Sequence, residues 1–241
     1  MFIDDGGVIS DNRVRAAQWQ RLVGEFLAPV LGGTPEQWAE ANREVVPPLW
    51  QDESLRHLWH RAGGDYATWL TLYRLAWLDA MCRYVGVATP PREKAVELAL
   101  RATEFVTHRV RAAFPGAVEA VRELHRRGFV LYTASGETSE ELKGYMSALG
   151  IRTAFRRLYG PDLVGVLKMG TEYYRRIFCD AGVRPADAIV VDDRPEAVAW
   201  AAEAGARTVL VGRDPVEGCQ ADVVIASLAG LPGLLKRQAL L

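Results

Sequence analysis

The stretch AIVVDDRP, residues 188–195, joins an unbroken apolar run to two carboxylates and a proline. Continuous Ile and Val without polar alternation is typical of a strand buried on both faces, as in a parallel sheet. Pro195 suits the first position of a helix, because the backbone N–H that proline lacks has no partner there. The stretch therefore predicts a buried strand that ends at an acidic turn and leads into a helix.

The same pattern recurs through the second half of the chain. From about residue 113 onward, short β-rich apolar runs alternate with helical patterns. Strands are predicted at 129–133, 158–159, 188–192, 208–211 and 222–225, and helices at 139–149, 172–181 and after Pro195. Such repetition predicts a parallel sheet with helices on both faces and right-handed crossovers. The fold class is therefore α/β, with a Rossmann-like core.

Residues 14–112 contain no comparable strand and read as consecutive amphipathic helices. These are expected at 13–31, 35–45, 53–62, 65–86 and 92–112. Six of the seven tryptophans fall here, which favours the core of a small helical bundle, with one or two left for a ligand pocket. The apolar start Met1-Phe2-Ile3 predicts a first strand of the same sheet. We therefore expect an α/β core of residues 1–13 and 113–241 and an inserted helical cap of residues 14–112.

Composition excludes several classes of protein. The chain has 241 residues, of which 49% are hydrophobic and 24% charged, and its formal net charge is -1. A nucleic-acid binder normally shows a basic footprint, and a membrane span needs roughly 20 apolar residues in a row. The start has no signal-peptide pattern, and Cys82, Cys179 and Cys219 match no metal-ligand spacing. We expect a cytoplasmic protein without nucleic-acid or membrane partners, whose oligomeric state the sequence leaves open.

Polar residues stand where the predicted strands end. Asp4 follows the first strand, Thr133 ends the second, and Asp192 and Asp193 end the strand of the opening stretch. Lys168 lies in the loop before the helix that leads into that strand. Ligands of open parallel sheets bind beyond these carboxyl ends. Carboxylates there suit Mg²⁺, and an ammonium with a hydroxyl suits the oxygens of a phosphoryl group.

Four ordered segments carry a family resemblance. They are FIDDGGVISD (2–11), LYTAS (131–135), VGVLK (164–168) and VVDDRP (190–195). Together they resemble the four motifs of the haloacid dehalogenase-like hydrolase superfamily, and the strand pattern at 204–211 follows the fourth as in that family. A helical insert between the first two motifs is the first cap class of the family. The resemblance covers nearly the whole chain.

The resemblance implies a role for each matching residue. Asp4 would be the nucleophile that forms an aspartyl intermediate, and Thr133 and Lys168 would grip the transferring group. The implied metal ligands for Mg²⁺ are Asp4, the backbone carbonyl of Gly6, Asp193 and, directly or through water, Asp192. The residues implied in substrate binding are Thr133, Ala134, Ser135 and Lys168.

One position departs from the family pattern. Phosphatases of the family carry a second Asp two residues after the nucleophile, and here that position is Gly6. Asp5 does not replace it, because neighbouring side chains of an extended segment point to opposite faces. Losing a general acid/base costs about 10²–10⁴-fold in rate. We therefore predict a Mg²⁺-dependent phosphomonoester hydrolase of low activity, acting on a small phosphorylated metabolite, with its proton supplied by a cap residue such as His57 or His60, by water or by the substrate.

Other functions remain open from the sequence. A carbon–halogen hydrolase needs no proton for the departing halide, but dehalogenases of the family have an Asn where Ala134 stands and lack the acidic pair. A catalytically silent relative would bind a phosphorylated ligand or a partner protein. A carbon–phosphorus hydrolase ranks last, because it needs a cap lysine and Lys94 is the only candidate.

Overall fold

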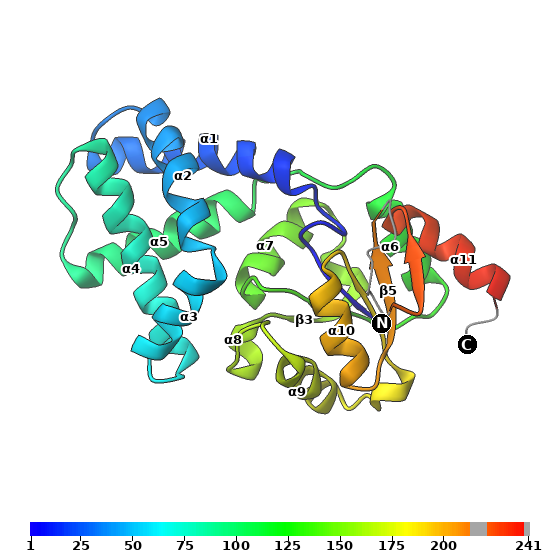
Figure 1. Cartoon of the computed structure of the whole chain (residues 1–241). Coiled ribbons are helices and arrows are strands. Elements are labelled where there is room, and N and C mark those ends of the chain that lie inside the picture. Colours follow the sequence, from blue (N-terminus) through cyan, green and yellow to red (C-terminus); the bar gives the residue numbers. More distant parts are fainter. Residues whose placement is uncertain (213–220, 239–241) are drawn as a thin grey trace. The chain divides into compact units, whose positions relative to one another are not determined.

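The computed structural model describes residues 1–212 and 221–238, which fall into two compact units (Figure 1). The sheet unit comprises Met1–Asn12 and Ala112–Leu241, and the helical unit comprises Arg13–Arg111. The sheet unit is thus assembled from two segments that are distant in sequence.

Within the described residues, the sheet unit contains one sheet of parallel strands in the order β3-β2-β1-β4-β5-β6. The strands are β1 (Phe2–Ile3), β2 (Leu131–Ala134), β3 (Phe155–Tyr159), β4 (Ile189–Asp192), β5 (Arg207–Val211) and β6 (Val223–Ile225). This confirms the predicted α/β class. The two-residue strand β1 lies between β2 and β4, with Ile3 level with Thr133 on one side and Val191 on the other. Whatever follows β1 therefore emerges between the ends of β2 and β4.

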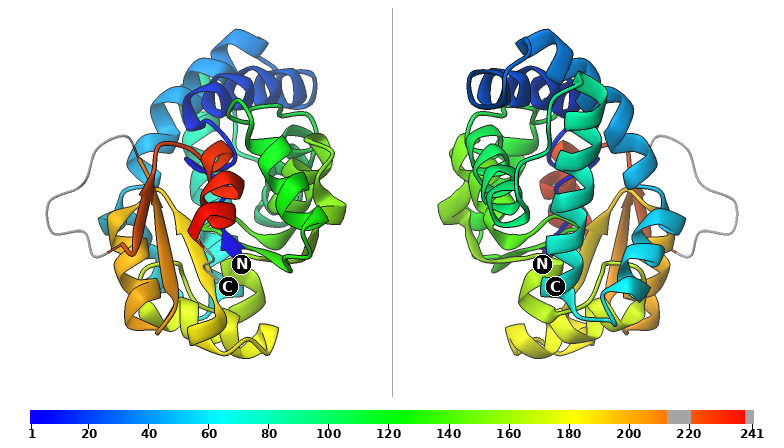
Figure 2. Two further views of the ribbon diagram at one scale, coloured as in Figure 1. Left: turned by 90° about the vertical axis from the view of Figure 1, so that its right-hand side faces the viewer. Right: turned by 90° about the vertical axis from the view of Figure 1, so that its left-hand side faces the viewer.

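Helices cover both faces of this sheet (Figure 2). They are α6 (Ala117–Arg126), α7 (Ser139–Ala148), α8 (Pro161–Val164), α9 (Thr171–Ala181), α10 (Pro195–Glu203) and α11 (Leu231–Gln238), with short 3₁₀ turns η1 (Arg152–Ala154), η2 (Pro185–Asp187) and η3 (Leu228–Gly230). Helices α9 and α10 pack on one face, and α6 packs with α11. The core under α9 and α10 includes Phe2, Tyr132, Val190, Tyr174, Phe178, Ala197 and Ala201. Phe2 stacks on Tyr132 with ring centroids 4.8 Å apart, which anchors the short first strand.

The helical unit contains α1 (Asn12–Leu31), which begins at the last residue of the sheet unit's first segment, α2 (Pro35–Leu49), α3 (Asp52–Arg61), α4 (Tyr66–Val85) and α5 (Arg92–Thr107). Thr34 and Gln37 form a capping box at the start of α2. Trp38 is fully buried and donates from Nε1 to the Gly32 carbonyl at 2.8 Å. Trp50, by contrast, is 45% exposed, so the tryptophans are not uniformly core residues.

The last helix of this unit is shorter than the sequence pattern predicts. Helix α5 ends at Thr107, whereas the pattern extends to residue 112. Beyond the helix, Asp11 donates its backbone N–H to the Ala112 carbonyl at 2.7 Å, and Ala113 pairs with Ser10. The backbone beyond the helix thus pairs with the segment that follows β1. Local periodicity carries no information about this pairing.

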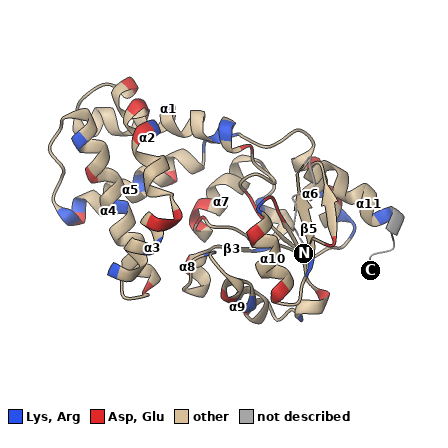
Figure 3. Ribbon diagram, viewed as in Figure 1, with Lys and Arg blue, Asp and Glu red and all other residues tan. Residues whose placement is uncertain are grey.

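Charged residues of both signs are mixed along the helices of each unit (Figure 3). Among the described helices, none combines the length and apolar content that crossing a membrane requires. Cys82 is buried and Cys179 exposed, and both are free thiols. Cys219 lies outside the described residues.

The loop between β2 and α7 approaches the start of α8 through a glycine. A Cβ atom on Gly160 would lie 2.1 Å from the carbonyl oxygen of Glu137, which is far inside van der Waals contact. Ser139 at the beginning of α7 donates its backbone N–H to Asp162 at 2.8 Å across the same gap. The absence of a side chain at position 160 therefore sets the place of the loop at residues 135–139.

We expect Gly160→Ala to lower the free energy of unfolding by about 1–3 kcal/mol, because a backbone atom has to move to admit the methyl group. Urea denaturation measures the change. Gly136→Ala in the same loop is the matched control, because its Cβ would meet nothing within 4 Å, and we expect a change of at most about 0.5 kcal/mol. Equal stability of the two variants would show that the contact at Gly160 is unimportant.

Candidate active site

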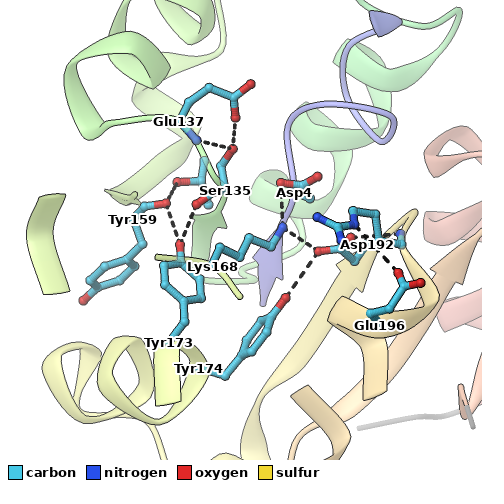
Figure 4. Close-up of polar contacts among 11 residues, drawn as sticks. Asp4, Ser135, Glu137, Tyr159, Lys168, Tyr173, Tyr174, Asp192 and Glu196 are labelled. Carbon is cyan, nitrogen blue, oxygen red and sulfur yellow. Dashed lines mark hydrogen bonds and ion pairs between the residues drawn. The ribbon is translucent and has the colours of Figure 1, made fainter. Parts of the chain in front are cut away.

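A buried lysine joins the ends of two neighbouring strands. Asp4 directly follows β1, and its backbone N–H donates to the Val191 carbonyl of β4 at 2.9 Å. The Lys168 ammonium lies 3.0 Å from Asp4 Oδ1 and 2.7 Å from Asp192 Oδ2 (Figure 4). All three side chains are at most 9% exposed. The sequence prediction that distant carboxylates and a lysine share one site is thus met in geometry.

Two local features deliver Lys168 to this position. The lysine precedes α9 and is the central residue of a tight turn, which a 2.8 Å hydrogen bond from Met169 N–H to the Leu167 carbonyl closes. From the second turn of α9, the Tyr174 hydroxyl donates to the same Asp192 oxygen at 3.4 Å. The other Asp192 oxygen accepts the backbone N–H of Arg194 at 3.0 Å. Asp192 therefore both shapes the turn before α10 and anchors the lysine.

The second carboxylate of the acidic pair lies against the segment that follows β1. Gly7 has a φ of 82°, a left-handed conformation that glycine adopts without strain. A Cβ on Gly7 would lie 1.9 Å from Asp193 Oδ2. Glycine at position 7 is therefore needed for the backbone turn and also for the room that the Asp193 carboxylate occupies.

Asp4, Asp192 and Asp193 form a cluster with the character of a cation site. One oxygen from each lies within 4.8 Å of the others. Three carboxylates surround one ammonium, so the site has an excess of negative charge when all are ionised. Hard oxygen ligands in such a group fit Mg²⁺, and a divalent cation would relieve their repulsion. The donor set therefore fits the metal that the sequence predicts, with Asp4, Asp192 and Asp193 as the side chains to hold it.

The electrostatics of the cluster follow from burial and from these neighbours. Burial raises the pKa of Asp4 well above its usual range; Lys168 opposes this, while the negative charges of Asp192 and Glu137 add to it. Burial alone would lower the pKa of Lys168, but Asp192 and Asp4 outweigh it, so the pKa is raised and the ammonium stays charged. Burial, followed by the charge of Asp192, raises the pKa of Asp193 to about 6. Asp4 and Asp193 therefore resist ionisation, and a bound metal cation would favour their charged forms.

Asp5 and Gly6 belong to the turn after β1. Asp5 is fully buried and accepts the Ser10 hydroxyl at 2.8 Å. Its backbone carbonyl accepts N–H groups from Ile9 at 2.9 Å and Ser10 at 2.8 Å. Asp5 thus closes the turn, and its carboxylate is held by Ser10 inside that turn. Gly6 pairs with Ser10 in an isolated bridge, and the role of its carbonyl as a metal ligand stays a prediction.

The residues at the end of β2 have different surroundings and hydrogen-bond partners. Thr133 is fully buried, and its hydroxyl donates to the Tyr159 carbonyl at 3.1 Å. Its neighbours Tyr132 and Ala134 face the core under α9 and α10. Ser135, the first residue beyond the strand, donates its hydroxyl to the Glu137 carboxylate. The hydroxyl of Thr133 is therefore engaged within the sheet, and the substrate-binding roles of Thr133, Ala134 and Ser135 stay predictions.

Three side chains near the cluster were not found by sequence reasoning. Tyr174 contacts Asp192, and the Tyr173 hydroxyl donates to the carbonyls of Ser135 at 2.9 Å and Tyr159 at 3.2 Å. Glu137 acts electrostatically on Asp4. The sequence could have indicated Glu137, because it is an acidic residue only two positions after Ser135. The tyrosines had no such signal, because a buried aromatic pair at the start of a helix reads as core.

The fold and the site define an α/β protein with an acidic, lysine-linked centre at the carboxyl edge of its parallel sheet. The family model for haloacid dehalogenase-like hydrolases matches residues 10–205, so the chain belongs to this hydrolase family. Asp4 precedes the matched range, so the family model does not cover it, and its role as nucleophile stays a prediction. No curated protein sequence matches the chain at a significant level.

Solved structures share the whole fold at low sequence identity. The L-2-haloacid dehalogenase from Xanthobacter autotrophicus with chloropropionic acid covalently bound has a TM-score of 0.65 and 19% identity, covering 98% of each chain. The 2-haloacid dehalogenase from Pseudomonas syringae pv. Tomato DC3000 has a TM-score of 0.67 and 20% identity, covering 98% of this chain and 97% of the other. CbbY from Rhodobacter sphaeroides in complex with phosphate has a TM-score of 0.58 and 18% identity, covering 95% and 94%. At these identities the likeness concerns the fold.

We expect Lys168→Met to destabilise the metal-free protein by about 3–5 kcal/mol, because two buried carboxylates would lose the charge between them. Urea denaturation in EDTA tests this. The control is Lys143→Met, which removes an exposed lysine paired with Glu140 and is expected to change stability by less than about 1 kcal/mol. A loss at Lys168 no larger than at Lys143 would mean that Asp4 and Asp192 are accommodated without the ammonium.

The raised pKa of Asp193 predicts the pH dependence of stability. Between its ordinary value of 3.8 and about 6, the folded metal-free protein binds more protons at this site than the unfolded chain does. The free energy of unfolding should therefore fall as the pH rises through this window, and Asp193→Asn should flatten the fall. Denaturation at pH 4, 5, 6 and 7 in EDTA measures the slope. Asp187→Asn at an exposed position is the control, and an unchanged slope in Asp193→Asn would contradict the assignment.

Proposed function

We propose that this hydrolase cleaves a phosphomonoester of a small metabolite through nucleophilic attack by Asp4. The observation that carries the proposal is the cluster of Asp4, Asp192 and Asp193 around the buried Lys168 ammonium. A phosphoryl group is anionic, and an excess of carboxylates repels it. The acidic cluster is therefore useful for phosphoryl transfer when it serves to hold a cation.

Each residue of the cluster has a task in this reaction. The Lys168 ammonium orients the Asp4 carboxylate and neutralises an oxygen of the phosphoryl group. An Asp4 oxygen attacks phosphorus, the ester bond breaks, and the alcohol departs from an aspartyl phosphate. Water then attacks the phosphorus and releases inorganic phosphate, which restores the Asp4 carboxylate. When bound by Asp4, Asp192 and Asp193, Mg²⁺ would supply charge neutralisation between the carboxylate and the phosphoryl oxygens.

A carbon–halogen hydrolase is the second candidate, and two observations favour it. Most of the similar solved structures reported above are of haloacid dehalogenases, so the comparisons favour this alternative over a phosphatase. Gly6 has no acidic side chain, and a departing halide needs no proton. The charge of the site disfavours this candidate. A haloacid is itself an anion, and three carboxylates with one ammonium would repel it. The two candidates therefore differ in their need for a cation.

An activity panel separates the two candidates. We expect phosphate release from phosphomonoesters that requires Mg²⁺, stops in EDTA, and falls on the order of 10³-fold or more in Asp4→Asn, because the attacking oxygen is lost. Chloride release from 2-chloropropionate is assayed in parallel with and without EDTA. Chloride release that is insensitive to EDTA would favour the dehalogenase. Binding of phosphate without turnover of any ester, seen as a rise in melting temperature, would indicate a silent relative.

A further inference from the structure

The proposed phosphatase lacks an acid where its family relatives are expected to carry one. Position 6 is glycine, and the neighbouring carboxylate of Asp5 is fully buried and bound by the Ser10 hydroxyl. His57 and His60 are exposed residues of α3 in the helical unit, and their part in proton transfer stays a prediction. Within the sheet unit, a proton donor for the departing alcohol is to be sought among the other acidic groups that act on Asp4. Asp192 is already engaged by Lys168, Tyr174 and Arg194.

Asp193 belongs with Asp4 and Asp192 to the cluster that suits a cation, and Glu137 is a further carboxylate whose charge raises the pKa of Asp4. Glu137 lies in the loop after β2, and the Ser135 hydroxyl donates to its carboxylate. Glu137 follows β2 and Asp192 ends β4, the two strands that flank β1, so in Figure 4 Glu137 and Asp192 lie on opposite sides of Asp4. The side chain is half-buried, so it is shielded and still reachable by a ligand.

The loop that carries Glu137 is fastened at several points. Ser135 donates its N–H to the Tyr159 carbonyl at 3.2 Å, and its own carbonyl accepts the Tyr173 hydroxyl at 2.9 Å. The Glu137 carbonyl is seated over Gly160, where a side chain would displace it. Directly after it, Thr138 caps α7 and donates its N–H to Glu141 at 2.7 Å. A carboxyl group on so constrained a backbone is held in place before substrate arrives, as acid/base catalysis requires.

We propose that Glu137 is the catalytic acid and base that serves in place of the missing carboxylate at Gly6. The inference rests on the proposed phosphatase function. As Asp4 attacks phosphorus and the ester bond breaks, the electron pair of that bond stays on the alcohol oxygen, which takes the proton of the Glu137 carboxyl group. The resulting Glu137 carboxylate then removes a proton from the water that attacks the phosphorus. Release of phosphate returns Asp4 to its carboxylate and leaves Glu137 protonated for the next turnover.

Glu137→Gln, compared with the control Glu140→Gln, tests this role by leaving-group dependence. Glu140 is an exposed residue of α7 that pairs with Lys143. Glu140→Gln therefore removes one carboxylate, as Glu137→Gln does, but outside the site. The substrates are p-nitrophenyl phosphate, whose leaving group departs without a proton at neutral pH, and an alkyl phosphate, whose leaving group needs one. Steady-state phosphate release, the burst of p-nitrophenolate, and phosphorylated Asp4 detected by mass spectrometry after rapid quenching are measured with Mg²⁺.

In Glu137→Gln we expect alkyl phosphate turnover to fall by about 10²–10⁴-fold. With p-nitrophenyl phosphate we expect a burst close to that of the control, followed by slow hydrolysis, so that phosphorylated Asp4 accumulates. Glu137→Asp keeps a carboxyl group on a side chain one carbon shorter. Its alkyl phosphate turnover should lie between that of Glu137→Gln and that of the control. Melting curves compare the folding of all variants.

Two results would overturn the inference alone. The first is alkyl phosphate turnover in Glu137→Gln within threefold of the control. The second is an equal loss of turnover with both substrates and no burst of p-nitrophenolate, which would indicate a merely structural role. If neither the unmodified protein nor Glu140→Gln releases phosphate from either substrate, the proposed function fails and takes this inference with it.

Discussion

The site is organised by one buried ammonium group. Lys168 lies between Asp4 and Asp192, which come from the ends of adjacent strands and would otherwise repel each other in a poorly solvated space. Burying charges is costly, and such a group is tolerated only when its partners are close and well oriented. The end of β1, the end of β4 and the loop before α9 are therefore linked by a single charge. Asp193, with its raised pKa, remains available for a cation.

Glycine contacts determine how closely the surrounding loops approach this centre. At Gly7 the backbone turns with positive φ directly beside the Asp193 carboxylate. At Gly160 the start of α8 makes room for the carbonyl of Glu137. These two positions place acidic groups on opposite sides of Asp4. In the proposed mechanism, the same parallel sheet would support a cation site on one side of Asp4 and a proton-transfer group on the other.

The fold is shared with dehalogenases and with CbbY in complex with phosphate, so the chemistry has to be argued from charge. Substitution at carbon and at phosphorus can both begin with the same carboxylate nucleophile. What separates them is the treatment of the leaving group and of the negative charge on the substrate. A cluster of three carboxylates would favour phosphorus if it held a divalent cation, whereas the glycine at position 6 favours a leaving group that needs no proton. The proposed role of Glu137 would reconcile these two features within one reaction.

The sequence by itself determined the α/β class and the convergence of Asp4, Lys168, Asp192 and Asp193. Apolar periodicity is local, and parallel strands bring their carboxyl ends to one edge, so these inferences needed no coordinates. Only the tertiary structure decided that the Thr133 hydroxyl binds the Tyr159 carbonyl, that Tyr174 reaches Asp192, and that the charge of Glu137 raises the pKa of Asp4. Such contacts depend on side-chain direction and on pairing between segments far apart in the chain. The physical reason is that a residue's spacing along the chain gives its face on an element, but not the neighbour that the fold brings to that face.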